Sequence, residues 1–311
     1  MLSRTAENLF WIARYVERAE GAARLYSVGA RGALIPAAAG GHRNEWEAVL
    51  KASGLPAEGG VSRHAVRRLL VTDPDSPSSV VACLLRAREN GRIVRTALTS
   101  LTWEALGEAK AAAEEIACAP PGAIGAQETF DRVMRLCSLV RGAAAGTQLR
   151  DDGWDFLRLG HLIERLDGTA RVMDVKYFVL LPSASMVGSG VDNYGWTTIL
   201  RALSSQGAYT WAHGGPPSAE RIVRFLVFDP DCPRSLRFGA EEMLGHLERL
   251  ARRYGGGGAA LARARSLYAE LAEMTVAEVF EEGLHEFLIR MQGEGAALSA
   301  AIADDYFGGG A

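Results

Sequence analysis

The stretch NLFWIARYVERAEGAAR, residues 8–24, decides the fold because it occurs twice. It returns as DFLRLGHLIERLDGTAR at residues 155–171, and both copies contain the pattern Glu-Arg-x-acid-Gly-x-Ala-Arg. In each copy apolar residues recur at steps of three and four, which is the period of an amphipathic helix. The repeated pattern therefore predicts two equivalent helices, each with an apolar face that must pack on another helix.

Two further landmarks recur in the same order along the chain. Residues 46–52 (WEAVLKA) return as residues 196–202 (WTTILRA), and residues 73–79 (DPDSPSS) return as residues 229–235 (DPDCPRS). An ordered series of repeated landmarks indicates an internal duplication. Strand signals are essentially absent. We expect an all-α helical bundle built from two tandem repeats, residues 1–153 and 154–311, related by a pseudo-twofold axis and packed as one compact unit.

Turn and cap residues predict where the helices begin and end. Ser3 or Thr5 can cap a first helix that runs to about Arg31, and Ser62 can cap a short helix. Thr275 to Glu278 forms a capping box before a last helical region. The repeated Asp-Pro-Asp segments are interpreted as Asx turns with a cap at Ser76 or Cys232. Longer helices are expected over residues 127–150, 154–181, 194–212, 218–228, 233–254 and 259–274, and residues 80–119 are expected to form one long or broken helix.

Composition excludes several functional classes. The 311 residues are 48% hydrophobic and carry a net charge of −3, so the basic surface that nucleic acids require is missing. The four cysteines show neither a zinc spacing nor a disulfide framework. No apolar stretch is long enough for a signal core or a membrane span. We expect a cytoplasmic protein that binds neither nucleic acid nor membrane.

The repeated helix also contains the candidate site. Arg14, Glu17, Gly21 and Arg24 share one helix face, and their counterparts are His161, Glu164, Gly168 and Arg171. The glycines are expected to let a second helix approach closely, which places the glutamates beside a tight crossing with arginine partners. Two interpretations stay open, namely buried ion pairs between the halves or a polar pocket at their interface.

The candidate residues were assigned by the chemistry that each side chain offers. Glu17 and Glu164 are the candidate catalytic residues, as general bases. A second polar stretch at residues 86–95 offers a further set that could grip an anion or form an exposed ion-paired face. The substrate-binding candidates are Arg14, Arg18, Arg24, Glu89, Arg92, His161, Arg165 and Arg171.

Metal and cofactor binding are disfavoured. His161 and Glu164, with Glu242 and His246, have the spacing of a carboxylate-bridged metal site. However, Arg14 stands where the second copy has His161, and a permanent cation repels a metal. Phosphate-loop, nucleophile-elbow and zincin motifs are absent from the sequence. We expect neither a metal nor another cofactor.

The chain resembles the bacterial alpha-E domain family over essentially its whole length. The opening residues 1–20, MLSRTAENLFWIARYVERAE, carry the most specific resemblance. Supporting motifs are residues 87–92 (ARENGR), 103–104 (WE), 194–196 (YGW), 231–235 (DCPRS) and 306–307 (YF). The resemblance implies an all-helical protein, typically encoded with or fused to circularly permuted ATP-grasp ligases and transglutaminase-like proteins. Such settings suggest amide or peptide bond formation or processing.

Three functions remain open at this point. The leading one is an accessory module that binds an ATP-grasp partner, or its carboxylate-bearing peptide-like substrate, in a Glu/Arg pocket at the repeat interface. The second is an enzyme that makes or cleaves amide bonds with Glu17 or Glu164 as general base. Neighbouring arginines would lower the pKa of such a base, which favours binding over catalysis. The third is a pure scaffold held together by the ion pairs.

Overall fold

The structure is a computed structural model that describes residues 1–32, 45–56, 61–120, 123, 125–179, 190–215 and 217–308. Over these residues every regular element is a helix, which confirms the all-α prediction. The first half contains α1 (Ser3–Gly32), α2 (Glu45–Ala52), α3 (Arg63–Arg67), α4 (Val80–Ile93), α5 (Ser100–Cys118) and α6 (Ala126–Thr147). The second half contains α7 (Asp152–Val179), α8 (Gly190–Ala202), α9 (Gln206–His213), α10 (Ala219–Val223), α11 (Leu236–Tyr254), α12 (Ala259–Glu273), α13 (Val276–Glu282) and α14 (Leu284–Tyr306).

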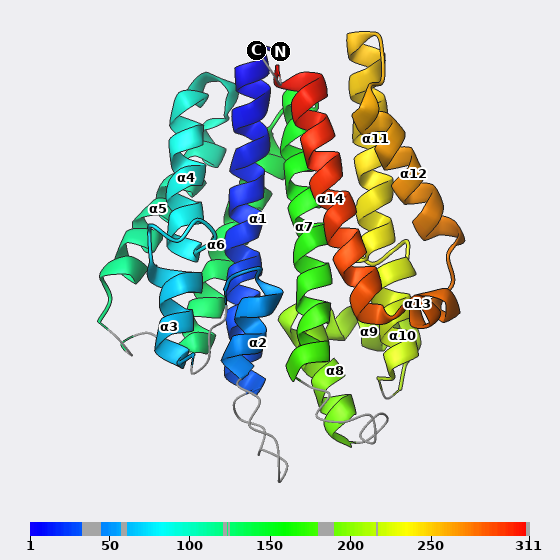
Figure 1. The fold of residues 1–311 in the computed structure, drawn as a ribbon. Helices are drawn as coiled ribbons and strands as arrows, with labels where there is room; N and C mark the ends of the chain where they lie inside the picture. Colours follow the sequence, from blue (N-terminus) through cyan, green and yellow to red (C-terminus); the bar gives the residue numbers. More distant parts are fainter. Residues whose placement is uncertain are drawn as a thin grey trace.

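Two long helices, α1 and α7, lie side by side at the centre of the molecule (Figure 1). Two contacts show that the helices run in the same direction. Near their N-terminal ends the amino group of Met1 binds Asp152 (2.9 Å), and near the middle of each helix Glu17 binds Arg165 (3.0 Å). Helices α4 and α6 pack on α1 and are joined by α5, whereas α11 and α14 pack on α7 and are joined by α12. The repeated stretch thus forms the central pair of the bundle.

The apolar faces of the central pair explain why it is buried. Apolar side chains from both halves form one continuous core that includes Leu9, Ile12, Leu159 and Ile163. The helices approach closely at Gly160, where a Cβ atom would overlap the main-chain carbonyl of Phe10. The crossing therefore requires a glycine one turn before Glu164.

Several helix boundaries differ from the predicted ones. Of the two forms expected for residues 80–119, the broken one is present: α4 and α5 are separate helices, because the Thr99 side chain accepts a hydrogen bond from the Thr102 amide and starts a new helix. The helix expected over residues 194–212 breaks at Ser204, whose φ is +56°. Helix α1 already includes Ser3 and Thr5, so neither residue is its cap. Most of the two connections that follow the predicted helix ends at Arg31 and at residue 181 lies outside the described residues.

The two Asp-Pro-Asp segments have the same local structure. A π-helical segment precedes each one (Arg68–Thr72 and Arg224–Phe228), and the first aspartate accepts a hydrogen bond from the amide two residues later. These contacts confirm the predicted Asx turns. The predicted caps were wrong, because Ser79 and Ser235 cap the following helices, and each side chain also donates to the carbonyl of the first aspartate.

Other local predictions were confirmed. Ser62 caps α3, and Thr275 and Glu278 form the capping box of α13. None of the helices in the described ranges is both long and apolar enough to cross a bilayer.

Candidate functional site

Glu164 on α7 is bound by two arginines from α1. Arg18 donates to it through Nε (2.5 Å) and Nη2 (2.9 Å), and Arg14 donates through Nε (2.9 Å). Arg14 also stacks on the ring of Trp11, with its guanidinium carbon 4.8 Å from the ring centre. Helix periodicity places Arg14 and Arg18 on one face, one turn apart, so both can reach the same carboxylate.

Glu17 on α1 is bound in the reciprocal manner by α7. Arg165 donates to Glu17 through Nε at 3.0 Å, and Nδ1 of His161 lies 3.1 Å from the other carboxylate oxygen. His161 and Arg165 are the sequence counterparts of Arg14 and Arg18. Each central helix therefore supplies one glutamate, and its own basic side chains bind the glutamate of the other helix. Both carboxylates are almost fully buried.

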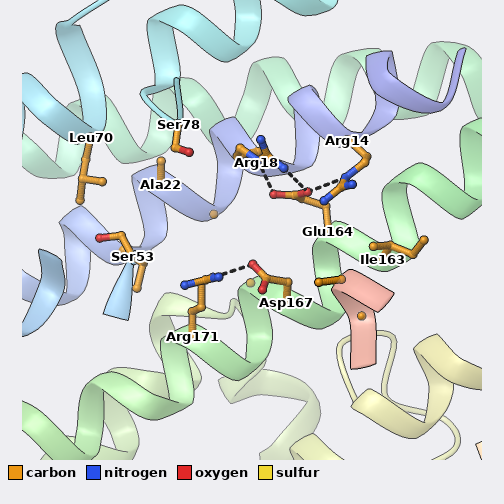
Figure 2. Close-up of a pocket in the computed structure, with 15 residues that line it drawn as sticks. Arg14, Arg18, Ala22, Ser53, Leu70, Ser78, Ile163, Glu164, Asp167 and Arg171 are labelled. Atoms are coloured by element: carbon orange, nitrogen blue, oxygen red, sulfur yellow. Dashed lines mark hydrogen bonds and ion pairs between the residues drawn. The ribbon is translucent and has the colours of Figure 1, made fainter. Parts of the chain in front are cut away.

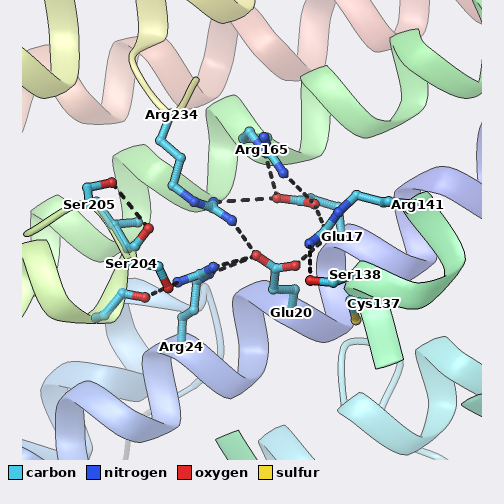
Figure 3. A network of polar contacts seen from close by, with 12 residues as sticks. Glu17, Glu20, Arg24, Cys137, Ser138, Arg141, Arg165, Ser204, Ser205 and Arg234 are labelled. Carbon is cyan, nitrogen blue, oxygen red and sulfur yellow. Dashed lines mark hydrogen bonds and ion pairs between the residues drawn. The ribbon is translucent and has the colours of Figure 1, made fainter. Parts of the chain in front are cut away.

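On one side of the crossing, arginines surround the carboxylates completely (Figure 3). Glu20, with 0% of its side chain exposed, accepts hydrogen bonds from Arg24 at 2.5 and 3.0 Å. Arg141 of α6 binds both Glu17 and Glu20, and so does Arg234, which precedes α11. We call this group the filled cluster; its members are Glu17, Glu20, Arg24, Arg141, Arg165 and Arg234.

On the other side of the crossing a cavity of about 320 Å³ remains (Figure 2). We call it the open pocket. Its charged wall consists of Arg14, Arg18, Glu164, Asp167 and Arg171. The remaining wall is made of small or apolar residues that include Gly21, Ser53, Ser78, Gly168 and Gly295. The pocket therefore combines fixed charges of both signs with free volume.

Asp167 is the least satisfied carboxylate in the open pocket. Its Oδ2 atom accepts a hydrogen bond from Nε of Arg171 at 2.6 Å, and Nη1 of Arg171 is held by the carbonyl of Ala52 at 3.0 Å. No described residue donates a hydrogen bond to the Oδ1 atom of Asp167. One carboxylate oxygen is thus available to a ligand.

The pKa values follow this difference in partners. Burial raises the pKa of Glu17, but Arg165, His161 and Arg234 outweigh burial and hold it well below its ordinary value. Burial and Glu17 raise the pKa of Glu20, yet Arg24, Arg234 and Arg141 lower it to about 2. Burial likewise raises the pKa of Glu164, while Arg18 and Arg14 bring it below the usual value. All three glutamates are therefore ionised at neutral pH.

Asp167 and His161 shift in the direction that favours their neutral forms. Burial raises the pKa of Asp167, and Arg171 offsets only part of that effect. Burial lowers the pKa of His161 to about 4 despite the attraction of Glu17, with Arg165 acting in the same direction as burial. A neutral His161 can donate its Nδ1 hydrogen to Glu17.

The repeated glycines act differently from the prediction. Gly21 and Gly168 were expected to admit a close helix crossing, but a Cβ atom at either position would meet nothing within 4 Å, and both residues line the open pocket. The close approach is instead made at Gly160. Absence of a side chain at Gly21 and Gly168 enlarges the cavity rather than tightening the interface.

The predicted site residues divide into three groups. Arg24 and Arg165 belong to the filled cluster, together with the adjacent His161, whereas Arg14, Arg18 and Arg171 line the open pocket. Glu89 and Arg92 pair with each other on α4 at 2.7 Å, are exposed, and make no contact with either group. Sequence reasoning missed Arg141, Arg234, Glu20 and Asp167 as site residues, although the acid of the repeated motif pointed to the last two.

The candidate metal ligands do not converge. Glu242 pairs with Arg158 and His246 lies 2.7 Å from Asp155, whereas Glu164 pairs with Arg14 and Arg18. No group of three or more His, Cys, Asp or Glu side chains in the described ranges is arranged to hold a metal ion. The metal alternative considered for His161 and Glu164 therefore gains no support.

The fold and the site define an all-helical protein in which glutamate–arginine pairs cross-link two parallel central helices. The chain belongs to the Alpha-E family, described as a predicted alpha-helical domain with a conserved ER motif, whose model matches residues 1–307. E and R are the one-letter codes of glutamate and arginine, and Glu17–Arg18 and Glu164–Arg165 are such pairs at the crossing.

Curated relatives include uncharacterized proteins of Mycobacterium bovis and Mycobacterium tuberculosis. Each is 26% identical to this chain over 270 residues, which covers 79% of this chain and 30% of the relative. The match thus spans less than a third of the length of those proteins. No solved structure matches the chain.

Proposed function

We propose that this chain is an accessory binding module whose open pocket holds a small ligand through a carboxylate group. The observation that carries this proposal is the state of the pocket arginines. Nη2 of Arg14, Nη1 of Arg18 and Nη2 of Arg171 donate to no described residue, while other nitrogens of each guanidinium fix its position. Held guanidinium groups with free N–H donors suit a carboxylate, which accepts such bonds bidentately.

Charge and size support the same ligand class. Three arginines face the two carboxylates of Glu164 and Asp167, so the wall carries an excess of one positive charge. An anion entering a partly desolvated site of this kind is attracted by that excess. A cavity of about 320 Å³ lies at the lower end of ordinary ligand pockets, which corresponds to an amino acid or a short peptide segment.

The contacts disfavour the general-base alternative for Glu17 and Glu164. A general base works best with a pKa near the working pH, whereas arginines hold the pKa of both carboxylates below the ordinary value. The scaffold alternative fits Glu17 better, because its oxygens are already occupied in the filled cluster. We therefore assign a structural role to the filled cluster and a binding role to the open pocket.

We further propose that residues 1–153 and 154–311 are tandem repeats related by a pseudo-twofold axis along the central helix pair. The reciprocal ion pairs of Glu17 and Glu164 support this, as do the matching helix neighbours of α1 and α7. The open pocket and the filled cluster are then two versions of one site.

The partner proposal rests on the family resemblance. We propose that the module works with a circularly permuted ATP-grasp ligase, with a transglutaminase-like protein as a further partner. The match covers only 30% of each curated relative, so in those proteins this module is part of a longer chain. Such an arrangement suits a module that presents a carboxylate substrate to a separate catalytic unit. Its site of action would then be the cytoplasm, where ATP is available.

A binding titration tests the carboxylate. Pentanoate is titrated into the native protein, Arg171→Gln and Arg92→Gln, with binding followed by ligand-observed NMR. Loss of a charged hydrogen bond in the pocket is expected to weaken binding by about tenfold or more in Arg171→Gln. Arg92→Gln, which removes an exposed arginine outside the pocket, should bind like the native protein. Equal binding by Arg171→Gln and native protein contradicts the proposal.

A reconstitution tests the partner. The purified chain is mixed with a purified circularly permuted ATP-grasp protein from the same organism, and complex formation and ATP-dependent ligation are measured. The proposal predicts that ligation depends on this chain and is reduced by Glu164→Gln when thermal melting shows an intact fold. Ligation at the same rate without the chain, together with no complex, contradicts the partnership but leaves the carboxylate titration as a separate result.

A further inference from the structure

The filled cluster and the open pocket differ at one comparable position. Ser78 and Arg234 occupy the same place in the repeated Asp-Pro-Asp segments, directly before the capping residues Ser79 and Ser235. Because the two segments share their turn and cap hydrogen bonds, position 78 lies beside the open pocket as position 234 lies beside the filled cluster. An arginine thus enters one site, and a serine borders the other.

Like Arg234, Arg141 of the filled cluster lacks an equivalent in the open pocket. Arg141 reaches Glu17 and Glu20 from α6, which packs on α1. The wall that α14 contributes to the open pocket, where it packs on α7, includes Gly295. The space of two guanidinium groups is therefore left as cavity.

Asp167 is the sequence counterpart of Glu20, and it lacks the corresponding cations. Glu20 is bound by Arg24, Arg141 and Arg234, whereas Asp167 is bound only by Arg171 among the described residues. Asp167 lines the open pocket, which lies between α1 and α7 (Figure 2), and its Oδ1 atom has no partner among the described residues. A partly buried carboxylate with an unused oxygen favours a cation that enters from outside.

We propose that the ligand of the open pocket is zwitterionic: a guanidinium or ammonium group binds Asp167 where the filled cluster has Arg234, while a carboxylate binds the pocket arginines. The class is a basic amino acid or a peptide residue of that kind. The inference rests on the proposed carboxylate site and adds the cation to it.

The charge balance allows such a ligand. The filled cluster holds four arginines against two glutamates, with His161 neutral, so the fold already tolerates an excess of two positive charges. One added cation brings the open pocket to the same excess, and the ligand carboxylate then reduces it. Both ends of a zwitterion therefore meet a partner of opposite charge.

Three probes separate the cation from the carboxylate. L-arginine carries both groups, agmatine is arginine without the carboxylate, and pentanoate has a carboxylate without a cation. Each is titrated into the native protein, Asp167→Asn and the exposed-acid control Glu89→Gln, with thermal melting to verify the fold. Asp167→Asn should weaken L-arginine and agmatine by about tenfold or more, and pentanoate should bind as before or more tightly. Glu89→Gln should change none of the three.

The outcomes distinguish the two proposals. If L-arginine binds no better than pentanoate, or if Asp167→Asn leaves L-arginine unaffected, the cation site is overturned and the carboxylate site stands. If agmatine binds through Asp167 and pentanoate does not bind at all, the carboxylate site is overturned instead. If none of the probes binds the native protein, both are contradicted.

A second variant tests the position of the cation. Ser78→Arg introduces a guanidinium at the position that corresponds to Arg234, so it should occupy the pocket and abolish L-arginine binding while the melting temperature stays the same or rises. Arg92→Gln, an exposed position outside the pocket, is the control and should bind L-arginine like the native protein. Unchanged L-arginine binding by a folded Ser78→Arg protein overturns the assignment. If Ser78→Arg does not fold, the Asp167→Asn titration decides alone.

Discussion

The filled cluster and the open pocket are built from the same repeated motif, yet one is closed and the other is hollow. Glu20 is bound by three arginines, from α1, α6 and the segment before α11, whereas Asp167 has a single arginine and an adjoining cavity. The difference comes from residues outside the motif, because Ser78 and Gly295 are too small to fill the space. The same charged helix thus becomes a structural element or a binding site according to what its neighbours supply.

The largest expected effect is the loss of a carboxylate from the filled cluster. Glu20→Gln removes the carboxylate that binds Arg24 and one of the two carboxylates that bind Arg141 and Arg234, in a fully buried place, which should lower the free energy of unfolding by about 3–5 kcal/mol. The counterpart Asp167→Asn should cost less than about 1 kcal/mol, because burial already raises the pKa of Asp167. Chemical denaturation of both variants measures the contrast; equal losses would contradict the distinction between the two sites.

The next effect concerns pH, because burial lowers the pKa of His161 in the folded protein. The pKa of His161 is about 4 in the folded protein and about 6.5 when unfolded, so the unfolded chain binds more protons between these values. Stability should therefore fall as the pH drops from 6.5 to 4, by about 3 kcal/mol from this residue. His161→Gln should remove this part, while the smaller contribution of His246, whose pKa burial also lowers, remains. If the stability of His161→Gln falls between pH 6.5 and pH 4 as much as that of the native protein, His161 is not the source of this pH dependence.

A smaller effect is expected when the filled cluster is opened. Arg234→Ser places in the filled cluster the serine that the open pocket has at the corresponding position 78. The variant should lower the free energy of unfolding by about 2 kcal/mol, because charged hydrogen bonds to Glu17 and Glu20 are lost. Agmatine should then restore part of the melting temperature by supplying a guanidinium at the vacated position. Agmatine that stabilises the native protein and Arg234→Ser equally would show that no new cation site has formed.

The smallest effect is a gain in stability. Gly168 lies inside α7 and borders the open pocket, and a Cβ atom there meets nothing within 4 Å. Gly168→Ala should raise the free energy of unfolding by about 0.5–1 kcal/mol, since alanine is the better helix former. Differential scanning calorimetry provides the measurement. Gly160→Ala is the contrasting variant and should destabilise, because its Cβ would overlap the carbonyl of Phe10.

The sequence predicts the helix pair well because that information is local. The Glu-Arg pair at residues 17–18 recurs at residues 164–165, which indicates two helices with matching charged faces. The structure contains ion pairs between these faces. The Asx turns of the Asp-Pro-Asp segments follow from the same short-range chemistry.

What the sequence could not predict depends on contacts between distant segments. Arg141 lies 124 positions from Glu17 and shows no motif of its own, so nothing local assigns it to the filled cluster. Gly21 and Gly168 look like sites of close helix approach, but whether a missing side chain admits a helix or leaves a cavity depends on the neighbouring elements. Glu89 and Arg92 have the right chemistry for anion binding but lie exposed on α4, outside the pocket.

The central claim is that a ligand enters the open pocket and leaves the filled cluster untouched. The most direct measurement is ¹³C NMR of the side-chain carboxylates while L-arginine is titrated into the native protein. The carboxylate resonance of Asp167 should shift in a saturable manner, and that of Glu20 should stay in place. A Glu20 resonance that moves as much as that of Asp167, or an Asp167 resonance that does not move, would contradict the claim.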